Sequence, residues 1–129
     1  METVLIADDE INIREGLKNI IDWNELGFEV CAEAANGEEA LCLILDKKPS
    51  LVLLDIRMPK IYGTDLIRMA RERGFQGRFI ILSGYSDFTY AQTAIQYGVD
   101  FYITKPIDED ELQLAICKIK KELDEEHAV

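Results

Sequence analysis

The sequence has few of the features that mark membrane or secreted proteins. No apolar run approaches the roughly 20 residues needed to cross a bilayer, and the first ten residues, METVLIADDE, lack the basic and long apolar segments of a signal peptide. The three cysteines, Cys31, Cys42 and Cys117, are odd in number and form no C-x-x-C pair. We therefore expect a reduced, cytoplasmic protein that uses its cysteines as small packing residues and has no membrane contact.

Basic residues are also scarce. The chain has 14 Lys and Arg against 25 Asp and Glu, which gives a formal net charge of −11. Proteins hold nucleic acid through clustered basic side chains, so we expect no direct nucleic acid contact by this chain. If the protein acts on DNA, another domain must make that contact. The length of 129 residues fits one domain.

Two kinds of hydrophobic pattern alternate along the chain. Segments with apolar residues at helical spacing separate five short, β-branched-rich runs, and each pattern occurs five times. Such alternation predicts an α/β fold with a doubly wound parallel sheet, because parallel strands need crossover connections. The predicted strands are residues 3–7, 28–34, 50–55, 78–83 and 100–104.

Helix boundaries can be predicted from capping residues. In three places an Asn or Asp is followed three residues later by Glu, the pattern of a helix N-terminus. Gly74 and Gly98 stand where helices are expected to end. The predicted N-cap pairs are Asn12 with Glu15, Asn36 with Glu39, and Asp108 with Glu111.

Polar residues end four of the five predicted strands. Asp8 and Asp9 follow the first strand, Asp55 ends the third, Ser83 the fourth, and Lys105 follows the fifth. Ligands of open parallel sheets bind beyond the carboxyl ends of the strands, so these side chains are expected to share one site. Strands that merely end in polar residues would explain one or two of these positions, but hardly all.

The residue types indicate phosphoryl chemistry at a metal site. Clustered carboxylates repel one another unless a cation lies among them, and Mg2+ prefers such oxygen ligands. Lys105 and the Ser83 hydroxyl can each contact a phosphate oxygen. The remaining carboxylate, Asp55 on the central strand, is then the candidate nucleophile that would form an aspartyl phosphate.

Over nearly its whole length the chain resembles the response-regulator receiver domain of two-component signalling. The matching segments are LIADDE, LLDIRMPKIYG, ILSGYSD and FYITKPI. The resemblance implies a flavodoxin-like (βα)5 fold with strand order 2-1-3-4-5. It also implies that Asp55 accepts a phosphoryl group from a sensor histidine kinase. Mg2+ would be bound directly by Asp9, Asp55 and the backbone carbonyl of Arg57, and through water by Asp8.

The resemblance assigns further roles near the site. Pro106 is expected to follow a cis peptide bond, and Ser83 and Tyr102 are expected to form the switch that responds to phosphorylation. Simple packing of Tyr102 at a strand end, with its hydroxyl in water, is an equally good interpretation. The domain would catalyse only its own phosphorylation and dephosphorylation, and would not be an enzyme in the metabolic sense.

A narrower resemblance concerns the output domain of the regulator. IDWNELGFEVCAEAANGEEAL and LSGYSDFTYAQTAI are similar to receivers that precede an AraC-type helix-turn-helix domain in transcription regulators. Residues 1–124 would then form the receiver and residues 125–129 the start of a linker to a C-terminal DNA-binding domain. The face formed by the fourth helix, fifth strand and fifth helix carries mixed charges, among them Asp100, Lys118, Lys121 and Glu122. Phosphorylation is expected to promote a homodimer through this face.

Three other classes fit less well. A phosphatase of the haloacid dehalogenase class needs an Asp two positions after its nucleophile, where this chain has Arg57. A nucleotide- or flavin-binding module would share the sheet, but the chain has no G-x-G-x-x-G or G-x-x-x-x-G-K-[ST] motif. A degenerate receiver that is never phosphorylated would not be expected to keep all of its site residues, Asp8, Asp9, Asp55, Ser83 and Lys105.

Overall fold

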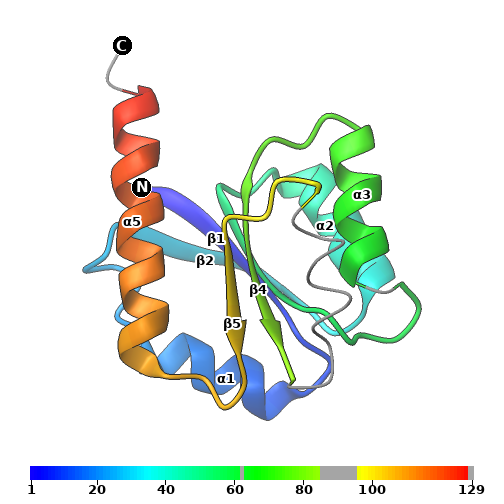
Figure 1. Ribbon diagram of the computed structural model, residues 1–129, viewed down its shortest axis with the longest axis horizontal. Coiled ribbons are helices and arrows are strands. Elements are labelled where there is room, and N and C mark those ends of the chain that lie inside the picture. Colours follow the sequence, from blue (N-terminus) through cyan, green and yellow to red (C-terminus); the bar gives the residue numbers. More distant parts are fainter. Residues whose placement is uncertain (62, 85–95, 128–129) are drawn as a thin grey trace.

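A single five-stranded parallel sheet forms the centre of the molecule. The computed structural model describes residues 1–61, 63–84 and 96–127. The strand order is β2-β1-β3-β4-β5, as predicted (Figure 1). The strands are β1 (Glu2–Ala7), β2 (Phe28–Ala34), β3 (Leu51–Asp55), β4 (Arg78–Ser83) and β5 (Phe101–Thr104).

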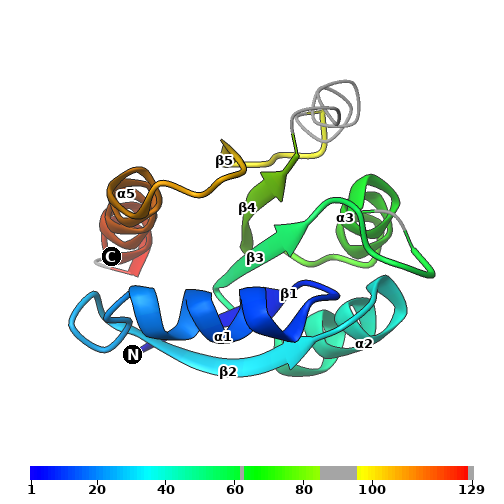
Figure 2. The same cartoon turned by 90° about the horizontal axis from the view of Figure 1, so that it is seen from below.

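Helices cover both faces of this sheet. The described part of the chain contains α1 (Ile11–Ile20), α2 (Gly37–Lys47), α3 (Gly63–Glu72) and α5 (Glu109–His127). Helices α1 and α5 lie on one face, and α2 and α3 lie on the other (Figure 2). The predicted fourth helix, with its stripe of Ala91, Ala94 and Ile95, falls outside the described residues.

The central strands supply both halves of the core. Along β1, Val4 and Ile6 pack with the α1 and α5 side, whereas Leu5 and Ala7 pack with the α2 and α3 side. Every residue of β3 is buried, including Asp55 at its end. A strand covered by helices on both faces is apolar throughout, so a carboxylate at its last position has a functional rather than a packing explanation.

Two of the three predicted helix starts are confirmed, and one is wrong. The Asn36 side chain accepts a hydrogen bond from the Glu39 amide, and Asp108 accepts from the amides of Asp110 and Glu111. Asn12, however, lies inside α1. This helix begins at Ile11 after the N-cap residue Glu10, whose side chain makes no capping bond.

The early start of α1 follows from the turn that precedes it. Asp8 Oδ1 accepts from the Glu10 amide at 2.9 Å, and the Glu10 carbonyl accepts from the amides of Ile13 and Arg14. A short Asx-type turn therefore joins β1 directly to α1, and a capping side chain at residue 12 is not needed.

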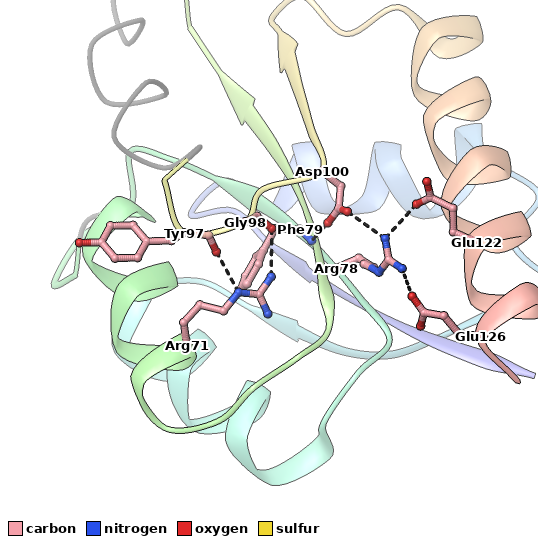
Figure 3. A network of polar contacts seen from close by, with 8 residues as sticks. All are labelled: Arg71, Arg78, Phe79, Tyr97, Gly98, Asp100, Glu122 and Glu126. Carbon is pink, nitrogen blue, oxygen red and sulfur yellow. Dashed lines mark hydrogen bonds and ion pairs between the residues drawn. The ribbon is translucent and has the colours of Figure 1, made fainter.

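A network of polar contacts around Arg71 and Arg78 joins α3 and α5 to the end of the sheet where β4 begins (Figure 3). Arg78, the first residue of β4, contacts Asp100 at 3.0 Å and Glu122 of α5 at 2.8 Å, and it also pairs with Glu126. Arg71 of α3 donates to the backbone carbonyls of residues 97, 98 and 75. These contacts fix α5 and the segment before β5 against the sheet.

Gly37 lies where the loop after β3 packs against the start of α2. Its amide donates to the Pro59 carbonyl at 3.0 Å. A Cβ atom at position 37 would collide with the carbonyl oxygen of Ile61 and lie 2.6 Å from the Ile61 Cβ. The loop that follows Asp55 therefore has room to pack only because residue 37 has no side chain.

Gly37→Ala should lower the free energy of unfolding by about 1–3 kcal/mol, the typical cost of overpacking. Helix propensity alone predicts the opposite sign, because Ala is favoured over Gly in a helix by about 1 kcal/mol. Gly16 in α1 provides the matched control, since a Cβ there meets nothing within 4 Å. Gly16→Ala should stabilise the protein in the same urea titration. Stabilisation by both substitutions would contradict the close packing at Gly37.

Candidate functional site

Three acidic side chains meet at the carboxyl end of the sheet. Asp8 and Asp9 directly follow β1, and Asp55 is the last residue of the neighbouring strand β3. One carboxylate oxygen from each of the three lies within 4.8 Å of the others. Asp8 is 1% exposed and Asp55 5%, whereas Asp9 is open to solvent. The three side chains therefore lie close together, as predicted from their positions at the carboxyl ends of parallel strands.

Lys105 joins the acidic cluster from the end of β5. Its Nζ lies 3.4 Å from Asp8 Oδ2 and 3.6 Å from Asp55 Oδ2. Burial by itself would lower the pKa of Lys105, but the charges of Asp55 and Asp8 outweigh it, and its pKa is raised. Lys105 therefore stays protonated and supplies one positive charge to a site with three carboxylates.

One lysine does not balance the cluster. Burial raises the pKa of Asp55 to about 6, the charge of Asp8 adds to this rise, and Lys105 opposes it. Burial also raises the pKa of Asp8. Asp8 and Asp55 are buried carboxylates whose raised pKa values disfavour ionisation, and Asp9 beside them is exposed. An additional cation at this site would stabilise the ionised carboxylates.

The donor set of this cluster fits Mg2+. All of its ligand atoms are oxygens, and the net charge of the four side chains is negative when all are ionised. Arg57, whose backbone carbonyl is the further expected ligand, follows Asp55 by two positions, and its amide donates to Asp55 Oδ1 at 3.2 Å. Asp8, Asp9, Asp55 and the Arg57 carbonyl would hold the ion.

Ser83 and Tyr102 contact each other beside the cluster. Ser83 ends β4 and is fully buried, and its Oγ donates to the Tyr102 hydroxyl. The same Oγ lies 3.2 Å from the Gly84 carbonyl. Tyr102 is half-buried against the α2 and α3 side of the core, and its hydroxyl accepts the hydrogen bond from Ser83.

The remaining predicted positions lie close by. The peptide bond between Lys105 and Pro106 is cis, and the Lys105 amide donates to the Ser83 carbonyl at 2.7 Å. The loop that follows Gly84 falls outside the described residues.

Sequence reasoning missed a second layer behind the acidic pair. Arg14 of α1 donates from Nη1 to the Asp8 carbonyl at 2.7 Å and from Nε to Glu33 of β2 at 3.1 Å. One signal could have revealed it. A cation near a helix N-terminus opposes the helix dipole, and the first turn of α1 has no acidic residue to offset it. An arginine in that position suggests a specific partner.

The chain belongs to the response regulator receiver domain family. The family model matches residues 4–117, which include all of the site residues described above. Receiver domains of two-component response regulators are phosphorylation-activated signalling domains, and this chain is one of them rather than a metabolic enzyme.

Individual relatives agree with this assignment. The chain is 41% identical over 128 residues to the transcriptional regulatory protein HptR of Staphylococcus aureus, a match that covers 99% of this chain and 50% of that protein. The REC domain of AraT, a response regulator from Geobacillus stearothermophilus, has a TM-score of 0.92 and 44% identity, with 98% of each chain covered.

A third relative is described as a two component transcriptional regulator AraC from Clostridium phytofermentans. Its structure matches with a TM-score of 0.88 and 32% identity over 100% of both chains. The chain spans about half the length of HptR. Within the part that the structure describes, no helix is long and apolar enough to cross a membrane.

Proposed function

We propose that Asp55 is the phosphoacceptor of this receiver domain and that its donor is a sensor histidine kinase. The observation that supports this role is the position of Asp55. Its carboxylate ends the central strand, lies 3.6 Å from the Lys105 Nζ, and shares the cluster with Asp8 and Asp9. Of the three acids, only Asp55 combines burial with a lysine contact and a place on the central strand.

The chemistry follows from these contacts. An Asp55 carboxylate oxygen attacks the phosphorus of the donor phosphohistidine, and the bond from phosphorus to the imidazole nitrogen breaks as the imidazole leaves. Lys105 offers its positive charge to a phosphoryl oxygen. When bound, Mg2+ supplies further charge to the phosphoryl oxygens. The domain thus catalyses its own phosphorylation, and hydrolysis of the acyl phosphate returns Asp55 to its initial state.

Ser83 and Tyr102 are proposed to report the phosphorylation. A phosphoryl group on Asp55 adds negative charge and strong acceptors, so the Ser83 hydroxyl can donate to it instead of to the Tyr102 hydroxyl. Tyr102 would then be released from its present partner. A change of partner at a buried hydroxyl is a local event that the neighbouring helices can transmit.

The complete regulator is proposed to act on transcription through a C-terminal DNA-binding domain of the AraC type. HptR is a transcriptional regulatory protein in which this chain matches about half of the length. Helix α5 continues to His127, beyond the proposed domain boundary at residue 124. The boundary and the cytoplasmic location stay predictions.

Homodimerisation on activation also stays a prediction. Two of the four charged residues expected to pair across the dimer already have partners within the chain, because Asp100 and Glu122 both contact Arg78. Lys118 lies over the Phe101 ring, with Nζ 5.8 Å from its centroid. A dimer through this face would therefore depend on rearrangement of existing contacts or on Lys121.

Incubation with Mg2+ and acetyl phosphate should add one phosphoryl group to the parent protein and none to Asp55→Asn. Asp46→Asn is the matched control, because Asp46 is an exposed aspartate on α2 away from the cluster, and it should be labelled like the parent. Lys105→Ala is expected to be labelled but not to switch. Intact-mass spectrometry measures the labelling, and equal labelling of Asp55→Asn would show that Asp55 is not the acceptor.

A further inference from the structure

Arg14 lies behind the loop that carries Asp8 and Asp9, and the proposed function gives it no role. Its side chain is only 13% exposed although it belongs to a short surface helix. The guanidinium makes two bonds at once, from Nη1 to the Asp8 carbonyl at 2.7 Å and from Nε to Glu33 Oε1 at 3.1 Å. It therefore joins α1, the loop after β1 and the edge strand β2.

The bond to the Asp8 carbonyl acts on Asp9. That carbonyl belongs to the planar peptide unit between Asp8 and Asp9, so the bond from Arg14 fixes the plane from which the Asp9 side chain extends. The Asp8 amide is held separately by the Ala34 carbonyl at 3.0 Å, and Asp8 Oδ1 by the Glu10 amide at 2.9 Å. Arg14 thus restrains the peptide unit that precedes Asp9, the exposed member of the cluster.

Glu33 orients Arg14. Its second oxygen, Oε2, accepts from Lys18 Nζ at 2.8 Å. The hydrogen bond from Lys18, with that from Arg14, lowers the pKa of Glu33, so this carboxylate remains charged. Only the planar fork of a guanidinium can donate to a carboxylate and a backbone carbonyl in fixed relative directions, and the single ammonium of a lysine cannot reproduce that geometry.

We propose that Arg14 is a positioning residue for the metal site. Held by Glu33, it fixes the peptide between Asp8 and Asp9 so that both carboxylates face Asp55. This inference rests on the proposed Mg2+ site. Partners in the layer behind metal ligands orient those ligands, and their loss typically weakens metal affinity about 10–100-fold.

Titration calorimetry with MgCl2 alone tests the proposal. Arg14→Lys keeps the positive charge but cannot donate to Glu33 and to the Asp8 carbonyl in the same geometry. This variant should bind Mg2+ at least about 10-fold more weakly than the parent. Lys18→Gln is the matched control, because it removes the other cation on Glu33 without touching the Asp8 loop. Its Mg2+ affinity should remain within about twofold of the parent, as expected for loss of a surface ion pair.

A second measurement separates positioning from general loss of structure. In acetyl phosphate reactions, the Mg2+ concentration that gives half-maximal labelling should rise in Arg14→Lys by the same factor as the dissociation constant. The labelling rate at saturating Mg2+ should stay near the parental rate. The metal-free melting temperatures of Arg14→Lys and Lys18→Gln should fall by similar, small amounts.

The possible outcomes separate the role of Arg14 from the existence of the Mg2+ site. If the parent binds Mg2+ and Arg14→Lys binds it equally well, or if Lys18→Gln loses as much affinity, Arg14 is not a positioning residue and the metal site itself stands. If the parent does not bind Mg2+ at all, the proposed metal site is wrong, and the role of Arg14 is overturned with it.

Discussion

Asp55→Asn should raise the free energy of unfolding of the metal-free protein by about 1–3 kcal/mol at pH 7. Burial, together with the charge of Asp8, raises the pKa of Asp55 from 3.8 to about 6, and a tenfold change in proton affinity corresponds to about 1.4 kcal/mol. The ionised carboxylate is therefore destabilising at neutral pH. Asn keeps an oxygen for the Arg57 amide, and Lys105 keeps Asp8 as its partner.

The stability difference between Asp55→Asn and the parent should depend on pH. Because the folded protein holds the Asp55 proton more tightly than the unfolded chain, the contribution of Asp55 to stability is full below pH 3.8 and is lost as the pH rises through about 6. The advantage of Asp55→Asn should therefore grow over this interval and vanish below it. Urea unfolding in EDTA at a series of pH values measures the difference.

The control for this experiment is again Asp46→Asn. Asp46 is exposed on α2, so its replacement should change the free energy of unfolding little at any pH in the series. If Asp55→Asn is no more stable than the parent at pH 7, the burial and repulsion attributed to Asp55 are wrong. Such a result would also weaken the electrostatic case for a cation at this cluster.

Mg2+ should stabilise the parent protein by about 2.7 kcal/mol at a concentration about 100 times its dissociation constant, as mass action requires for a ligand of the folded state alone. The ion also relieves the repulsion among Asp8, Asp9 and Asp55. Asp9→Ala should abolish this gain. Because Asp9 is exposed, its truncation removes a ligand without leaving a cavity in the core.

Two comparisons separate binding from general salt effects. NaCl at matched ionic strength should not reproduce the stabilisation, because screening acts on all exposed charges alike. Glu10→Gln changes the neighbouring exposed acid, which is not part of the cluster, and should keep the full Mg2+ response. A parent melting temperature that does not respond to Mg2+ would count against the metal site.

The sheet and the acidic cluster could be predicted because both follow from local patterns. Alternating periodicity identified the five strands, and the family resemblance supplied their order. Asp8, Asp9, Asp55 and Lys105 then meet because strand ends of a parallel sheet share one edge. Asn36 also signalled its helix correctly, since an N-cap interaction spans only three residues.

Features that depend on contacts between distant segments could not be predicted. Arg14 and Glu33 are 19 residues apart. The place of Arg14 near a helix N-terminus suggests that it has a partner, but nothing in either segment identifies that partner as Glu33. The need for glycine at position 37 arises from Ile61 in another loop. Asn12 matched a capping pattern by composition, but the turn formed by Asp8 started the helix earlier.

The arginine network at the other end of the sheet has an evolutionary consequence. Among the described residues, Arg78 is the cation that forms ion pairs with Asp100, Glu122 and Glu126, so its loss would leave these three neighbouring acids without an ion-pair partner in that part of the chain. A neutral residue at position 78 should therefore be tolerated only after the acids have been lost. Across descendants of this sequence, the four positions are expected to change as a group, with the glutamates on α5 replaced before the arginine.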